Sequence, residues 1–151
     1  MNTVSKGLEI DFISTQYQET IPPDIHMSGE MEQVCENEVT SLLLKGAVTE
    51  TSDTDGFFSA LFVIPKKSGG FRPIVNLKGL NSFVCYEHFK MERLDSVKFL
   101  LKKGDWLVKL DLKDAYLLVP ILPNHQKFLR FRWKGRHFQF RCLPFGLSSA
   151  P

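Results

Sequence analysis

The alternation of apolar and polar residues predicts two β-hairpins. Residues 60–64 form an apolar run, and residues 71–75 follow it after a turn rich in Lys, Ser and Gly, which is typical of a hairpin. Residues 129–133 and 136–142 alternate strictly and are joined by Lys134-Gly135. Because successive strand side chains point to opposite faces, this second hairpin is expected to place one face in a core and a row of Arg or His on the other.

Helical periodicity is clearest in the first third of the chain. Val and Leu side chains form an apolar stripe within residues 34–43, which predicts a helix that starts at Ser28 or Gly29 and ends at Gly46. The other predicted segments are an extended lead-in at 1–27, a polar loop at 49–56, helical turns at 76–81 and after Pro123, and a short amphipathic helix at 94–101.

An apolar run at residues 106–110 leads directly to Asp111. The run predicts a buried strand that ends at a carboxylate, with Ala115 and Tyr116 one short turn further on. A carboxylate in this position, beside small and flat residues, suits a divalent-metal site that faces a nucleotide. An Asp that caps the turn after a strand is the ordinary alternative. The stretch by itself leaves both interpretations open.

Composition limits the class of protein. The chain has 151 residues, of which 43% are hydrophobic, enough for the core of one domain or part of one. No apolar run approaches the ~20 residues of a membrane span and no secretory signal opens the chain. We therefore expect a soluble intracellular protein without a membrane partner, in either the cytoplasm or the nucleus. The three cysteines are far apart in the sequence, which favours neither a disulfide framework nor a zinc site.

The charge is divided between the two parts of the chain. Residues 1–61 contain two Lys and eleven acidic residues, whereas residues 62–142 contain seventeen Lys or Arg and six acidic residues. A basic body with interleaved aromatic side chains would suit a surface that binds nucleic acid. In the alternative interpretation, the basic side chains are a solvated face and the alternate aromatic residues lie in the core.

The first hairpin carries Lys66, Lys67 and Arg72 at or near its tip. Two interpretations are open. Basic residues at a hairpin tip often protect a sheet edge from aggregation. They also suit a clamp on a triphosphate, because Lys supplies a point charge and Arg a planar fork for phosphate oxygens.

Three stretches in the same order resemble the reverse transcriptases. Residues 62–81 resemble their fingers hairpin, residues 110–116 resemble their first palm motif, and residues 143–151 resemble the turn that grips the template. The resemblance covers residues 28–151 and is greatest to retrotransposon enzymes of the DIRS and long-terminal-repeat (gypsy-type) lineages. Phe145 and the Gly104-Asp105-Trp106 lead into the palm motif are the features that favour these lineages.

The resemblance implies a catalytic and metal-binding role for Asp111. It would bind two Mg²⁺ ions, or Mn²⁺ as a substitute, with help from the backbone carbonyl of Leu112. Two-metal phosphoryl transfer requires carboxylates that hold the ions ~3.5–4 Å apart.

The resemblance also implies residues that bind the dNTP and the template. Tyr116 would be the steric gate against a ribose 2′-hydroxyl. The triphosphate would be held by Lys66 and Arg72, with Lys67 as the alternative to Lys66 if the register shifts by one residue. The remaining implied positions are Asp114, Ala115 and Phe145 at the dNTP, and Gly146 and Phe62 at the template.

The second palm motif of the family, an Asp-Asp pair, is absent from the sequence. We therefore expect an α+β N-terminal fragment of a right-hand polymerase, with antiparallel strands and short helices. The expected divisions are a lead-in at 1–27, a fingers-like part at 28–104 and a palm at 105–151 that is truncated before the Asp-Asp pair. Its expected partners are primer–template (RNA or DNA), dNTP and the remainder of a polyprotein, namely the rest of the palm, the thumb and ribonuclease H. The isolated chain is expected to be inactive. The alternative is a non-catalytic nucleic-acid-binding remnant of a retroelement.

Overall fold

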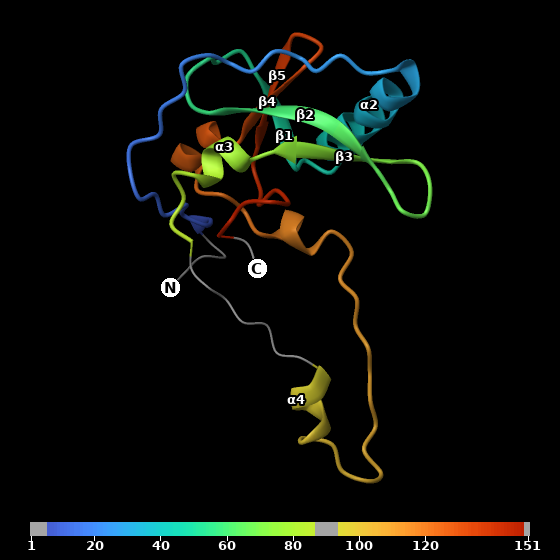
Figure 1. The fold of residues 1–151 in the computed structure, drawn as a ribbon. Helices are drawn as coiled ribbons and strands as arrows, with labels where there is room; N and C mark the ends of the chain where they lie inside the picture. Colours follow the sequence, from blue (N-terminus) through green and yellow to red (C-terminus); the bar gives the residue numbers. More distant parts are fainter. Residues whose placement is uncertain (1–5, 87–93, 150–151) are drawn as a thin grey trace.

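The centre of the molecule is one five-stranded sheet (Figure 1). The computed structural model describes residues 6–86 and 94–149. The strand order is β1-β5-β4-β2-β3. Neighbouring strands are antiparallel except β2 and β4, which are parallel, so the expectation of antiparallel strands is correct for three of the four pairings. The strands are β1 (Val48–Thr51), β2 (Phe58–Pro65), β3 (Phe71–Asn76), β4 (Arg130–Trp133) and β5 (Arg136–Phe140).

Both predicted hairpins are confirmed. In the first, Pro65 pairs with Phe71, and the turn between them contains Gly69 and Gly70 with φ of 90° and 75°, values that side chains with a Cβ rarely adopt. In the second, Lys134 and Gly135 both have positive φ. This two-residue geometry matches the right-handed twist of the flanking strands.

The aromatic side chains of β4 and β5 build the core. Phe131 is 0% exposed and stacks on Phe138 with ring centroids 5.3 Å apart. Phe140 and Trp133 are also buried. The strict alternation therefore places these rings inside the protein, and they do not form a surface for stacking bases. The interpretation with alternate aromatic residues in the core is the correct one here.

Helix α2 (Gly29–Leu44) begins where the sequence predicts and packs on the sheet through Cys35, Val39 and Leu42. Leu43, which the predicted stripe included, is exposed. Since 3.6 residues make one turn, the buried stripe passes through positions 35, 39 and 42. The shorter helices are α3 (Lys78–Asn81), α4 (Leu94–Lys98) and the 3₁₀ helices η1 (Ala115–Leu118) and η2 (Pro123–Phe128).

The described part of the lead-in, residues 6–27, lies along the body as an extended segment (Figure 1). It pairs by single bridges, Leu8 with Ile121 and Phe12 with Val84, and Ile10 is buried. This segment is therefore part of the folded body.

Two predictions of local structure are wrong. The polar loop predicted at 49–56 contains most of β1, which pairs with β5. Its pattern is hard to recognise because only Val48 is buried; the strand forms by backbone pairing at a sheet edge. The buried strand predicted at 106–110 is not formed, since these residues belong to no helix or strand.

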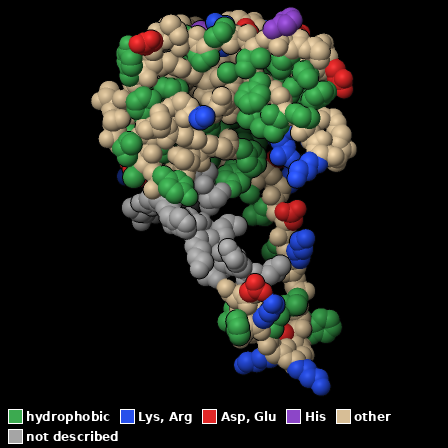
Figure 2. Space-filling view, in the orientation of Figure 1, with side chains coloured by type: hydrophobic (Ala, Val, Ile, Leu, Met, Phe, Trp, Pro, Cys, Tyr) green, Lys and Arg blue, Asp and Glu red, His purple; other side chains and the backbone are tan. Residues whose placement is uncertain are grey.

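Residues 94–113 project away from the sheet as a long excursion (Figures 1 and 2). Most apolar side chains there are solvent-exposed, including Phe99 and Leu100 near α4 and Trp106 at 97%. The amphipathic helix predicted at 94–101 is shorter than expected. No described helix is long and apolar enough to cross a membrane.

Candidate nucleotide-binding site

Asp111 lies in the projecting excursion, with an exposed side chain. It makes no hydrogen bond or ion pair with another described residue. A strand requires a neighbouring backbone to complete its hydrogen bonds, and within the described ranges no strand lies beside residues 106–110. The expected environment of Asp111, the end of a buried strand, is therefore not present.

Tyr116 and Phe145 come from two different predicted motifs and are in contact. Their ring centroids are 4.7 Å apart with the planes at 57°. Tyr116 lies in η1 and is partly buried against the core, whereas Phe145 is exposed. The fold thus brings together two of the residues predicted to bind dNTP, although they lie 29 positions apart in the sequence.

Asp114 precedes η1 in the left-handed conformation, with φ of 56°. Its carboxylate forms an ion pair with Lys45, Nζ to Oδ2, of 3.0 Å. Lys45 follows the last residue of α2, so this contact joins α2 to the predicted dNTP pocket. Sequence reasoning did not assign Lys45 any role.

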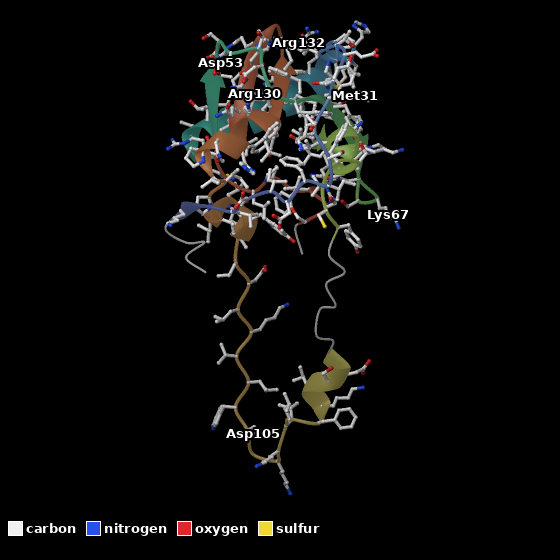
Figure 3. All side chains as sticks on the ribbon, turned by 90° about the vertical axis from the view of Figure 1, so that its left-hand side faces the viewer. Met31, Asp53, Lys67, Asp105, Arg130 and Arg132 are labelled. Carbon is white, nitrogen blue, oxygen red and sulfur yellow. The ribbon has the colours of Figure 1, made fainter. Side chains whose placement is uncertain are left out.

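The hairpin tip presents basic side chains to solvent. Lys66, Lys67 and Arg72 are exposed, and none of them forms an ion pair with a described residue. Figure 3 shows Lys67 pointing outward from the body. Arg72 lies opposite Ile64 on the paired strand. Phe62, which is predicted to bind the template, is partly buried against the core.

Asn81 connects α3 to the turn at 143–149. Its amide nitrogen donates to the carbonyl oxygen of Gly146 at 2.8 Å, and its amide oxygen accepts from the backbone N–H of Ser148 at 2.9 Å. Gly146, with φ of 93°, is the predicted template-binding residue. Asn81 ends the stretch that resembles the fingers hairpin, but the sequence offered no sign of this long-range role.

The basic row of β4 and β5 is neutralised by acidic residues from the first part of the chain. Arg130, only 3% exposed, donates to the Asp55 carboxylate at 2.8 Å and to Asp53 at 3.1 Å; Figure 3 shows Asp53 beside Arg130. Similar pairs join Arg132 to Asp24, Lys134 to Glu36 and Arg136 to Glu50.

These contacts change the acidity of the carboxylates. The hydrogen bond from Arg130 lowers the pKa of Asp55, and that from Arg136 lowers the pKa of Glu50. Hydrogen bonds from the Trp133 indole and from Lys134 lower the pKa of Glu36. Each carboxylate is therefore held in its charged form, and the β4–β5 row is occupied within the protein. The hairpin tip is a better candidate for binding a polyanion.

The described residues contain no group of three His, Cys, Asp or Glu side chains that could hold a metal ion. Asp111 belongs to no such group among these residues, and the nearest carboxylate along the chain, that of Asp114, is paired with Lys45. These residues do not by themselves fit a two-metal site.

The fold is that of a known class of polymerase. The prototype foamy virus protease–reverse transcriptase matches 94% of this chain with a TM-score of 0.70 and 17% identity, over 19% of its own length. A foamy viral protease–reverse transcriptase in complex with dsDNA matches 95% of this chain and 30% of its own, with a TM-score of 0.66 and 19% identity. The predicted α+β class and the fingers-like region are thereby confirmed.

The sequence defines the family. The family model described as reverse transcriptase (RNA-dependent DNA polymerase) matches residues 64–151, and the chain belongs to this family. It is 28% identical over 148 residues to the transposon Tf2-3 and Tf2-4 polyproteins of Schizosaccharomyces pombe (strain 972 / ATCC 24843). The alignments cover 97% of this chain but 11% of each polyprotein. The predicted kinship with retrotransposon reverse transcriptases is confirmed.

Proposed function

We propose that this chain forms the fingers, residues 28–104, and the first part of the palm, residues 105–151, of a retrotransposon reverse transcriptase. The intact enzyme adds dNTPs to a primer 3′-hydroxyl on an RNA or DNA template. Family membership and the polymerase fold support this proposal. The remainder of the polyprotein supplies the rest of the palm, the thumb and ribonuclease H, and the enzyme acts inside the cell.

The contact between Tyr116 and Phe145 is the structural observation that carries the proposal. Two residues from separate motifs meet at 4.7 Å, beside the turn that Asn81 fixes to α3. In the proposed site the Tyr116 ring excludes a ribose 2′-hydroxyl, Phe145 packs near the base, and Asp114 and Ala115 line the sugar and triphosphate pocket. Gly146 and Phe62 lie toward the template.

Lys66 and Arg72 hold the triphosphate in this proposal, with Lys67 as the alternative. Their lack of ion-pair partners among the described residues supports the role, because an unpaired cation on a hairpin is available to phosphate oxygens. The same charges attract primer–template, with an affinity that falls as salt rises.

Asp111 supplies one carboxylate to a site for two Mg²⁺ ions, assisted by the Leu112 carbonyl. Mg²⁺ takes hard oxygen ligands in octahedral geometry, so other carboxylates must come from elsewhere in a longer polymerase chain. A paired neighbour would also give residues 106–110 the strand conformation that they lack here. The isolated chain is accordingly expected to be inactive.

The test is a chimera in which this chain replaces the matching segment of a Tf2 polyprotein. We expect Mg²⁺-dependent dNTP incorporation that Asp111→Ala abolishes and that the control Asp95→Ala leaves unchanged, since the one ion pair of Asp95 with a described residue is with the nearby Lys98. Tyr116→Ala should increase ribonucleotide incorporation relative to dNTP incorporation. An active chimera that is indifferent to Asp111→Ala would refute the proposed catalytic role.

A non-catalytic nucleic-acid-binding module is the second candidate. The exposed position of Asp111, which belongs to no group of three possible metal ligands among the described residues, favours it. This candidate predicts that the 151-residue chain binds primer–template and that Lys66→Glu weakens binding, while the chimera incorporates no dNTP. Binding that does not change with salt concentration would argue against both candidates.

A further inference from the structure

The lead-in is attached to the segment at residues 119–122 by backbone hydrogen bonds. The N–H of Leu8 donates to the carbonyl oxygen of Pro120 at 2.6 Å, and the N–H of Leu122 donates to the carbonyl oxygen of Leu8 at 2.9 Å. Gly7 allows this close approach, because its φ is 95° and a Cβ atom there would lie 2.7 Å from the Leu122 nitrogen. The attachment therefore depends on a precise fit between the two segments.

A histidine makes the next contact with the lead-in. The backbone N–H of Ile10 donates to Nδ1 of His125 in η2, with 3.1 Å between the two nitrogens. Ile10 is 1% exposed, so solvent cannot readily replace this acceptor while the lead-in stays attached. Only an unprotonated ring nitrogen accepts a hydrogen bond. The contact therefore requires a neutral His125 ring that carries its proton on Nε2.

Protonation of His125 turns this attraction into a repulsion. Both ring nitrogens of an imidazolium are donors, so Nδ1–H then faces the N–H of Ile10, which is left buried without an acceptor. The ring also packs against Phe12 and Phe128, with centroids 5.9 and 6.0 Å away, and apolar surroundings disfavour a charged group. The neutral ring is the form that fits the attached lead-in.

The charged side chains around His125 oppose this effect only weakly. Oε1 of Glu9 lies 3.9 Å from Nε2 of His125, but the Glu9 side chain is 69% exposed, and exposed ion pairs contribute little. The other charged side chains of residues 6–12 and η2 are Lys6, Asp11 and Lys127. Lys127 is paired with Asp55 at 3.7 Å, and residues 119–122 carry no charge. Loss of the buried backbone hydrogen bond therefore outweighs the gain at the exposed carboxylate.

We propose that His125 is a pH-dependent switch, which holds residues 8–12 of the lead-in when its ring is neutral and releases them when its ring is protonated. Histidine is the side chain whose charge ordinarily changes between about pH 5 and 8, a range in which exposed carboxylates stay ionised. Because protonation removes a contact that holds the lead-in, attachment weakens as the pH falls. These contacts belong to the folded chain whatever reaction it serves, so the switch does not depend on the proposed polymerase function.

Release frees one side of the segment at residues 119–122. Its other side pairs with residues 141–143, where the N–H of Leu143 donates to the carbonyl oxygen of Val119 at 2.9 Å. Residues 141–143 lead directly into the turn at 143–149. The switch therefore acts on a backbone neighbour of the turn that contributes to the candidate nucleotide-binding site.

Hydrogen exchange of the Leu8 amide tests the switch in the 151-residue chain. We expect its protection factor to fall about tenfold between about pH 7.5 and about pH 5.5, the change produced when release lets one ordinary histidine take up a proton. His125→Asn places an amide oxygen near the position of Nδ1 and cannot be protonated in this range, so protection should stay high at both pH values. The control His26→Asn replaces an exposed histidine of the lead-in and should keep the wild-type response.

Two further measurements separate release from unfolding. The amide of Phe140, which donates to the carbonyl oxygen of Leu129 in the body, should be protected equally at both pH values. Gly7→Ala, which places a Cβ atom against residue 122, should lower Leu8 protection at both pH values and so show that exchange detects release. A wild-type Leu8 amide that is equally protected, or unprotected, at both pH values would overturn the switch. An equal fall in protection in wild type and His125→Asn, or a parallel fall at Phe140, would also overturn it.

Discussion

Asn81 holds Gly146 in place from 65 positions away in the sequence. The side-chain amide donates to the Gly146 carbonyl at 2.8 Å and also accepts from the N–H of Ser148 at 2.9 Å. One side chain therefore satisfies a donor and an acceptor of the same turn. Because α3 is joined directly to the β2–β3 hairpin, Asn81 links the turn after Leu143 to the basic hairpin.

We expect Asn81→Ala to destabilise the chain by about 1–3 kcal/mol, since two hydrogen bonds to backbone groups are lost, of which the one from the Ser148 N–H is partly buried. Urea unfolding measures the change. Hydrogen exchange of the Ser148 amide should accelerate by more than the global loss of stability predicts. Asn124→Ala is the matched control, because the Asn124 side chain is exposed and forms no hydrogen bond within the described ranges. Equal effects of the two substitutions would contradict the bridging role.

Replacing an aromatic side chain by Ala should change the free energy of unfolding much more in the core than in the exposed excursion. Phe131→Ala removes a ring that is 0% exposed and stacked on Phe138, so it should cost about 3–5 kcal/mol. Trp106→Ala changes a side chain that is 97% exposed and should change the free energy of unfolding by no more than about 0.5 kcal/mol. Urea unfolding at low protein concentration measures both.

Tryptophan fluorescence provides an independent check on this contrast. Trp106 is exposed and Trp133 is buried. With Trp133→Phe, the remaining emission should be quenched readily by iodide, whereas with Trp106→Phe it should be protected. A protected Trp106 would mean that residues 106–110 form the buried strand that their sequence predicts.

The sequence predicted the hairpins because local pattern and tertiary burial agree there. In β4 and β5 every second residue enters the core, so period-two alternation carries the information. The same reasoning failed at residues 106–110, where an apolar run has no strand beside it. It also failed at β1, where three of four residues are not buried. Backbone pairing decides both cases, and it depends on residues distant in the sequence.

The candidate site, like the fold, was predicted from the sequence in part. The contact between Tyr116 and Phe145 joins two motifs that the sequence had already singled out. The ion pair between Lys45 and Asp114 and the Asn81 bridge were missed, because neither side chain differs in type from ordinary surface residues. The basic block was overestimated as a free surface, since its β4–β5 charges pair with acidic residues that lie up to 108 positions earlier.

Acid should destabilise the fold by protonating the carboxylates that pair with the side chains of the β4–β5 hairpin. The folded-state pKa values of Asp55, Glu50 and Glu36 are lowered by their hydrogen-bonded partners. The folded state therefore binds protons more weakly than the unfolded state, so the stabilisation is present at neutral pH and is lost as pH falls through the lowered values. We expect the urea midpoint to decrease below about pH 4.

Arg136→Gln tests one of these pairs. Arg136 is the main cause of the lowered pKa of Glu50, so its removal should reduce the loss of stability on acidification. Arg141→Gln makes the same charge change at an exposed side chain without an ion pair among the described residues, and it should retain the wild-type acid profile. If Arg136→Gln instead lost stability more steeply on acidification, the Arg136–Glu50 pair would not be a source of acid-sensitive stability.

The three cysteines should separate by reactivity. Burial raises the pKa of the Cys35 thiol to about 11, with Glu38 and Glu32 adding to the effect, and burial raises that of Cys142 to about 11. Because the thiolate is the reactive form, a disulfide reagent at about pH 8 should label Cys85 in the folded chain and all three thiols in urea. Cys85→Ser should abolish labelling of the folded chain. Since the ordinary value is 9.0, the unfolded state ionises first as pH rises, and stability should decrease between about pH 9 and 11. Rapid labelling of folded Cys85→Ser would show that Cys35 or Cys142 becomes accessible to solvent in the folded chain.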